Sequence, residues 1–323
     1  MPDLVLLAAA RLKKAVVMRI RRIACGWEVW APAKLNLFLE ILRKREDGFH
    51  ELQTLMCPID VFDTLRLEDV PAATAEPAAI HCEVRSATSL AAGPAVPADR
   101  TNTVVRALDT LRQKAGVERG AKVSLFKRIP AQAGLGGGSS DAAAALVAAN
   151  LAWDLGYSRD QLMDVAASVG SDVPFFLARG WAWCRGRGEI VESVPPMPRL
   201  HVVVAHPGVG LSTPAVYSAC TPAEAAGEPP RTANHLLEAL QAGRYTALSQ
   251  HLHNRLQPPA QQLVPQVGQL AADFDRLGLV AHQMSGSGTA YFGICRHARH
   301  ARQAAARLRS RGWQTVFSTA TGI

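Results

Sequence analysis

The chain has 323 residues, of which 48% are hydrophobic and 19% are charged, and its formal net charge at pH 7 is +8. This composition is typical of a globular protein with a substantial core in two domains or one bilobed unit. The positive charge comes mostly from dispersed arginines, and no aromatic residues alternate with the basic run RHARHARQAAARLRSRGW. We therefore expect a solvated helix face there and no nucleic-acid partner.

Cysteine usage and the N-terminus indicate a reducing compartment. The six cysteines form no CxxC pair and no His/Cys group at zinc spacing, so free thiols in the cytoplasm are expected. The N-terminal run LVLLAAA follows no basic segment and is too short to span a bilayer, which predicts no secretion and no membrane partner. Residues 1–26 are expected to be an extension outside the fold, or the product of an upstream start, because Met18 could also initiate the chain.

The first half of the chain alternates between strand and helix patterns. Alternating or continuous apolar residues predict strands at 28–42, 55–69, 80–85 and 121–130. Apolar residues at helical spacing, with Asn or Gly at the ends, predict helices at 102–115, 141–156 and 160–170. The Ala/Pro-rich stretches around the third strand read as surface connections.

A second unit begins near Pro195, where the linker PPMP precedes the apolar strand HVVVAHP. After this strand the sequence predicts helices at 213–219, 234–242 and 257–277, a glycine-rich turn feeding the strand AYFGIC, a basic helix and the final strand WQTVFST. The fold class is therefore α+β, with two lobes at 27–195 and 196–323.

The stretch GLGGGSS, from Gly134 to Ser140, lies between a predicted strand and a predicted helix. Backbone N–H groups and the positive end of the helix dipole would meet at this turn and favour a phosphate. The alternative is a tight turn whose glycines only supply positive φ angles. The turn is not a Walker loop, because no lysine in the chain follows a glycine, and GxGxxG fails because Ser139 holds the sixth position.

Four segments in order resemble the GHMP kinases, the galacto-, homoserine, mevalonate and phosphomevalonate kinase superfamily. They are APAKLNLFLEILRKREDGFHELQTLM, PAQAGLGGGSSDAAAAL, GSDVPFFL and AHPGVGLSTPAVY. The resemblance implies a two-lobed fold with the active site in the cleft between the lobes. It also implies transfer of the γ-phosphoryl group of ATP, with Mg²⁺, to the 2-hydroxyl of CDP-methylerythritol in the bacterial non-mevalonate route to isoprenoids. The oligomeric state does not follow from it.

The resemblance assigns catalytic roles to Asp172 and Lys34. Asp172 would accept the proton of the attacking hydroxyl, although an Asp after Gly-Ser is by itself more often a turn residue. Lys34 lies in an apolar strand, where a buried ammonium must be paired or functional, unless it reaches solvent from a strand edge. Its charge would favour the ionised form of Asp172. Asn36 falls on the same face of the strand and matches a substrate-contacting position.

The implied ATP site combines the glycine loop with three residues on the adenine side. Its members are Gly134, Leu135, Gly136, Gly137, Gly138, Ser139 and Ser140, with Asn102, Lys127 and Pro130. Asn102 is equally consistent with a helix N-cap. Mg²⁺ is expected for charge neutralisation, and the sequence identifies no protein ligands for it.

The implied cytidine site consists of Phe49 and Tyr217 as a stacking pair, His50 reading the base edge, and Thr213 near the diphosphate or sugar. Gly286 and Gly288 are expected to let a further glycine turn approach the cleft. Two alternatives stay open: another GHMP kinase acting on a mevalonate-type or sugar substrate, and a ligand-binding regulator that has lost catalysis.

Overall fold

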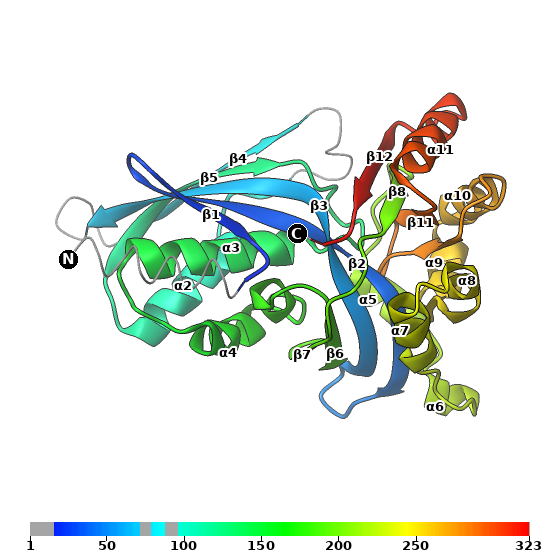
Figure 1. The fold of residues 1–323 in the computed structure, drawn as a ribbon. Coiled ribbons are helices and arrows are strands. Elements are labelled where there is room, and N and C mark those ends of the chain that lie inside the picture. The colour runs from blue at the N-terminus through cyan, green and yellow to red at the C-terminus, as the bar shows by residue number, and fades with distance from the viewer. Residues whose placement is uncertain (1–15, 72–78, 88–95, 323) are drawn as a thin grey trace.

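The computed structural model describes residues 16–71, 79–87 and 96–322 and consists of two sheets with helices packed against them (Figure 1). The first sheet is built mainly from the first half of the chain, and the second from residues after Leu200. Within the described ranges no helix is long and apolar enough to cross a membrane.

The first sheet has the strand order β1-β2-β3-β5-β4, and β6, β7 and β9 extend it along the long β2 and β3 strands. The β4–β5 and β2–β9 pairs are parallel and the others antiparallel. The strands are β1 (Arg19–Ile23), β2 (Gly26–Lys44), β3 (His50–Pro71), β4 (Ile80–Ser86), β5 (Arg119–Lys127), β6 (Ala182–Gly186), β7 (Ile190–Ser193) and β9 (His253–Asn254).

Three helices, α2 (Thr103–Ala115), α3 (Gly137–Ala152) and α4 (Arg159–Val169), cover one face of this sheet (Figure 1). The central helix α3 is buried nearly all round, which its alanines permit because small side chains let a helix lie close to its neighbours. The short 3₁₀ helix η2 (Pro174–Leu177) closes this layer with four buried residues.

The second sheet has the order β10-β11-β8-β12, and all its pairs are antiparallel. Its strands are β8 (His201–His206), β10 (Ala281–Met284), β11 (Tyr291–Cys295) and β12 (Thr315–Ala320). The helices of this half are α5 (Thr213–Ala219), α6 (Ala223–Ala226), α7 (Asn234–Gln241), η3 (Tyr245–Ala247), α8 (Leu248–His251), α9 (Gln257–Leu263), α10 (Pro265–Asp275) and α11 (Ala298–Ser310). The arginines of α11 face solvent around a buried stripe of alanines and Leu308, as its sequence indicated.

The expected strands and helices are present, with three differences. The expected helix at 257–277 is divided into α9 and α10 at Val264, because Pro265 disfavours a helical conformation in the residue before it. The expectation that residues 1–26 lie outside the fold is wrong for their last part. There β1 pairs with β2 and buries Ile20, whereas residues 1–15 lie outside the described residues. The sequence analysis also predicted none of the short strands β6, β7, β9 and β10 and none of the short helices η2, α6, η3 and α8.

One hydrophobic cluster joins the two sheets, since Leu35 and Leu37 of β2 pack with Val202 and Val204 of β8 and with Phe292 of β11. The chain passes from the first sheet to the second between Ser193 and His201. The division into separate domains at 195 stays a prediction.

Candidate functional site

A cavity of about 760 Å³ is lined by residues from both halves of the chain. Most of the expected site residues line it: Lys34, Asn36, Phe49, His50, Asn102, Lys127, Pro130, Gly134, Gly136, Gly137, Gly138, Ser139, Asp172, Thr213 and Tyr217. Leu135 and Ser140 do not, because both side chains are fully buried beneath the loop. The structure thus brings the expected residues together, and their individual roles stay predictions.

The glycine loop lies against the middle of β2, where Lys34 N donates to the carbonyl oxygen of Leu135 at 2.9 Å. Gly134 and Gly136 have φ angles of 75° and 72°, and α3 begins at Gly137. A Cβ atom on Gly136 would lie 2.8 Å from Lys34 Cγ, and one on Gly134 would lie 2.0 Å from the carbonyl oxygen of Ser285. Glycine is therefore required here by close approach as well as by backbone conformation. Gly136, Gly137, Gly138 and Ser139 line the cavity, and the first N–H groups of a helix such as α3 have no partner within the helix, as an anion site requires.

The ammonium of Lys34 lies 3.4 Å from Asp172 Oδ2 and also donates a hydrogen bond to Asn36 Oδ1. The Lys34 side chain is 4% exposed and that of Asp172 is 36% exposed, so the carboxylate can still reach a ligand in the cavity. Asp172 lies in the turn before η2, which Phe175 and Phe176 anchor in the core. The expectation that Lys34 is paired is met.

Asn36 is held in one orientation by a residue that the sequence did not single out. Its Nδ2 donates to Thr54 Oγ1 at 2.8 Å, and that hydroxyl donates to the carbonyl oxygen of Phe38 at 2.6 Å. The amide oxygen of Asn36 is therefore left to face Lys34. The sequence held one indication of this role, because Thr54 belongs to the same family-like segment as Asn36 and His50. In the structure it occupies a buried position of β3.

On the nucleotide side, Asn102 accepts a hydrogen bond from Val104 N at 2.8 Å and caps α2, so its alternative role as an N-cap is realised. Lys127 is not extended into the cavity. Its ammonium is buried between the carboxylates of Asp63 and Asp141, neither of which the sequence analysis named. Isolated acidic residues in a strand or helix carry no local signal of such pairing.

Around the residues expected to bind cytidine, the aromatic contacts differ from the expected stacking pair. The ring of His50 lies 5.3 Å from that of Tyr217, centroid to centroid, and Phe49 is 49% exposed with the guanidinium of Arg187 4.6 Å from its ring centre. Burial raises the pKa of Tyr217, and burial together with Lys44 lowers the pKa of His50, so both are neutral at pH 7. Arg187 is an additional cavity-lining residue without a sequence prediction.

The second sheet contributes the turn between β10 and β11. Thr213 Oγ1 is 2.9 Å from Ser287 Oγ, and Asn254 Nδ2 donates to the carbonyl oxygens of Met284 and Gly286 at 2.9 and 2.8 Å. A Cβ atom on Gly286 would lie 3.1 Å from Lys34 Nζ and from Asn36 Oδ1. The close approach expected of this turn is therefore present at Gly286.

Among the described residues, no group of three or more His, Cys, Asp or Glu side chains could hold a metal ion. These residues thus offer no carboxylate cage for Mg²⁺, an ion that keeps several waters and binds nucleotide phosphates readily. An ion carried in by ATP fits this arrangement, because Asp172 is a partly exposed carboxylate on the same cavity.

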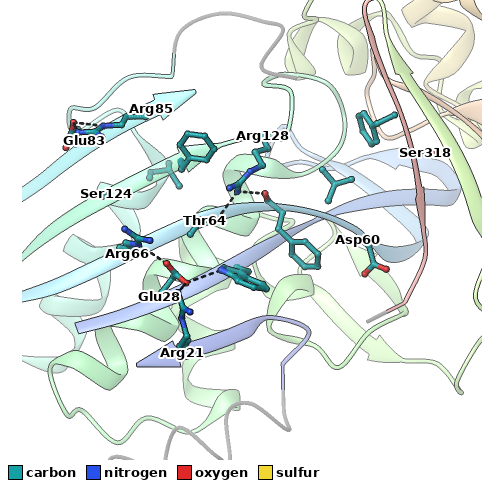
Figure 2. A pocket seen from close by; sticks show the side chains of 16 residues that line it. Arg21, Glu28, Asp60, Thr64, Arg66, Glu83, Arg85, Ser124, Arg128 and Ser318 are labelled. Atoms are coloured by element: carbon teal, nitrogen blue, oxygen red, sulfur yellow. Dashed lines mark hydrogen bonds and ion pairs between the residues drawn. The ribbon is translucent and has the colours of Figure 1, made fainter. Parts of the chain in front are cut away.

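A second cavity, of about 840 Å³, lies on the sheet face opposite α2, α3 and α4 (Figure 2). Several of its charges pair with one another: Arg21 and Arg66 flank Glu28, and Arg85 contacts Glu83. It contains none of the expected site residues.

Two family models match the chain: GHMP kinases N terminal domain over residues 102–180, and GHMP kinases C terminal over 236–313. The chain is 40% identical over 281 residues to a 4-diphosphocytidyl-2-C-methyl-D-erythritol kinase of Pelotomaculum thermopropionicum, covering 86% of this chain and 92% of the relative. For the kinase of the same name from Enterococcus faecalis the identity is 37% over 265 residues, covering 82% and 88%.

The comparison with solved structures agrees with these sequence matches. The chain resembles a crystal structure of 4-(cytidine 5'-diphospho)-2C-methyl-D-erythritol kinase with a TM-score of 0.74 and 36% identity, covering 92% of this chain and 99% of that one. Mevalonate kinase of L. major shares the fold at 16% identity with a TM-score of 0.70, covering 95% and 98%.

Proposed function

The chain belongs to the 4-diphosphocytidyl-2-C-methyl-D-erythritol kinases of the GHMP kinase family, and from this premise we propose how its residues perform the reaction. The enzyme phosphorylates the 2-hydroxyl of 4-diphosphocytidyl-2-C-methyl-D-erythritol with ATP, a step of the non-mevalonate pathway. The observation that carries the assignment of roles is the Lys34–Asp172 ion pair, which lies directly beside the glycine loop in one cavity.

Asp172 accepts the proton of the 2-hydroxyl as its oxygen attacks the γ-phosphorus. The ammonium of Lys34, 3.4 Å from Oδ2 of this carboxylate, orients it in the cavity. Asn36, fixed by Thr54, holds Lys34 from the other side, so the base is positioned before the substrate arrives.

The backbone N–H groups of the glycine loop and the N-terminus of α3 bind the triphosphate of ATP, with the adenine towards Asn102 and Pro130. Mg²⁺ would be held mainly by the phosphates of ATP rather than by a carboxylate cage, since none is present among the described residues, and it would supply charge neutralisation for the transferred group.

The cytidine end of the substrate binds among His50, Tyr217, Phe49 and Arg187. A flat apolar surface with hydrogen-bonding edges suits a pyrimidine, and Phe49, half-exposed in the free protein, can turn onto the base. Thr213 and Ser287 lie where the diphosphate or sugar would pass. The partners of the enzyme are then two small molecules, and its six free thiols support a bacterial cytoplasmic setting.

The test is a substrate panel. Purified enzyme with ATP and Mg²⁺ should release ADP with 4-diphosphocytidyl-2-C-methyl-D-erythritol and not with mevalonate, homoserine or galactose. Asp172→Asn should lower kcat by about 10²–10⁴-fold while the Kd for ATP stays within twofold. Asp160→Asn, a change at a carboxylate on the exposed surface of α4, is the matched control.

Substrate choice is tested separately from chemistry. Tyr217→Ala should raise the KM for the cytidine substrate strongly and leave ATP affinity unchanged. An active Asp172→Asn enzyme would refute the proton-acceptor role, whereas equal turnover of mevalonate would favour another GHMP kinase activity. Absence of turnover with every substrate would favour a regulator on the same fold.

A further inference from the structure

Beneath the glycine loop, three charged side chains from three elements meet away from water: Asp63 of β3, Lys127 of β5 and Asp141 of α3. The ammonium of Lys127 donates to Asp63 and, at 2.5 Å, to Asp141. The three side chains are 0%, 4% and 2% exposed. Lys127 lies under the loop itself, since a Cβ atom on Gly137 would be 3.2 Å from its Nζ.

The two carboxylates have unequal surroundings. Asp63 also accepts the backbone N–H groups of Arg128 and, at 2.9 Å, Ile129, so both of its oxygens are paired. Asp141 accepts one hydrogen bond, from Lys127, and its carboxyl group lies within hydrogen-bonding reach of the Asp63 carboxylate, which favours its protonated form. Within the described part of the chain, no group pairs with its Oδ1, although Asp141 lines the cavity that we assign to ATP.

One buried ammonium can balance only one of two buried carboxylates, and an uncompensated buried charge is expensive. Asp63 accepts hydrogen bonds from three donors, whereas Asp141 accepts one, from Lys127. Burial raises the pKa of Asp141 to about 8, because Lys127 offsets only part of the loss of water and the charge of Asp63 adds to it. Cys82 of β4 also faces Asp141, and burial with this neighbour raises the pKa of its thiol to about 11.

We propose that Asp141 lies beneath the bound nucleotide as a neutral acid, so that ATP binding is coupled to uptake of one proton from solvent. The inference rests on the proposed function, because it places ATP in this cavity. ATP adds several negative charges at the N-terminal turn of the helix that bears Asp141 and displaces water from the cavity. Both effects favour the protonated acid, and by linkage the protonated enzyme binds ATP more tightly.

Lys127 does not supply the titration. Burial opposes its charge, but the two carboxylates raise the pKa of Lys127 above its ordinary value, so it stays charged across the range tested. A purely structural Asp141, ionised and paired with Lys127 at all times, predicts nucleotide binding that does not depend on pH.

The experiment is calorimetric titration of the intact enzyme with Mg²⁺ and ATP, without the second substrate, from pH 7.5 to 9. The phosphates of ATP are fully ionised throughout this range, so they contribute no proton. We expect the ATP affinity of the wild type to fall about tenfold across it, and about half a proton to be taken up at pH 8. Buffers of different ionisation enthalpy measure this uptake directly.

Asp141→Asn should bind ATP with little pH dependence and no proton uptake, because the amide supplies an N–H donor at all pH values. Asp172→Asn, which removes the other carboxylate of the cavity, should keep the pH dependence of the wild type. Equal wild-type affinity at pH 7.5 and 9 would overturn the inference alone. Failure to bind ATP at any pH would overturn the proposed function with it. Since the uptake is measured on the wild type, the test does not depend on the folding of a variant.

Discussion

Gly136→Ala is the substitution whose cost follows most directly from the geometry of the site. The residue has a φ of 72°, where an L side chain costs roughly 1–2 kcal/mol. Its Cβ atom would lie 2.8 Å from both Lys34 Cγ and Phe176 Cζ, and relieving such overlaps typically costs about 1–3 kcal/mol. Neither neighbour is free to move, because Phe176 is fully buried and Lys34 is bound to Asp172 and Asn36. We expect a loss of roughly 2–5 kcal/mol of unfolding free energy.

The assay is thermal unfolding followed by circular dichroism. For a chain of this size the unfolding entropy is about 0.7 kcal/mol per degree, so Tm should fall by about 3–7 °C. Gly138→Ala, in the first turn of α3, is the matched control. The atom nearest to its Cβ would be Thr103 Oγ1, at 3.5 Å. This control should leave stability unchanged or raise it by up to about 1 kcal/mol. If both variants unfold with the wild type, close packing of the loop on Lys34 is not what requires glycine at 136.

Three further predictions concern residues that support the site. Glu40 is fully buried, and although burial alone would raise its pKa, hydrogen bonds from His253 and Arg255 lower it to about 2 from an ordinary 4.5. The stabilising effect of the ionised Glu40 is therefore complete above pH 4.5 and is lost as the pH falls towards 2. Glu40→Gln should lower the free energy of unfolding by about 3 kcal/mol at neutral pH, measured by urea unfolding, and should make that free energy less dependent on acidic pH. Thr54→Val should lower kcat by roughly 5- to 100-fold with ATP affinity unchanged, and Thr54→Ser should restore it in steady-state kinetics. Asn254→Ala leaves two carbonyl oxygens of the glycine turn without their donor, and should lower both Tm and, by about tenfold, kcat.

Local pattern was sufficient for most of the fold. Apolar periodicity and caps located the long strands, and α2, α3 and α4, because each has a clear boundary residue such as Asn102 or Gly170. It failed where tertiary contacts decide the outcome. The strand β1 is mostly arginine and isoleucine, and it forms because β2 offers an open edge. The short β6 and β7 strands pair only because β3 extends far enough to receive them.

The same limit applies to the site. The glycine loop, Lys34 and Asp172 each lie in a segment with its own motif, so the resemblance could locate them and the structure brings them to one cavity. Asp63, Asp141 and Thr54 are positioned by residues that lie far from them in the sequence. Lys127 and Asp141 are 14 positions apart, and Asp63 and Asp141 are 78 positions apart. No spacing rule connects such residues, because their proximity arises only when β3, β5 and α3 pack together.

The two lysines of the cavity show how charge balance assigns different tasks to similar groups. Lys34 serves one carboxylate, and Asp172 keeps a third of its side-chain surface accessible, so it can hold a negative charge and still meet a ligand. Lys127 serves two carboxylates in a dry interior, where only one can be ionised at low cost. A proton acceptor for catalysis therefore belongs on the first pair, and a carboxyl group that keeps its proton belongs on the second.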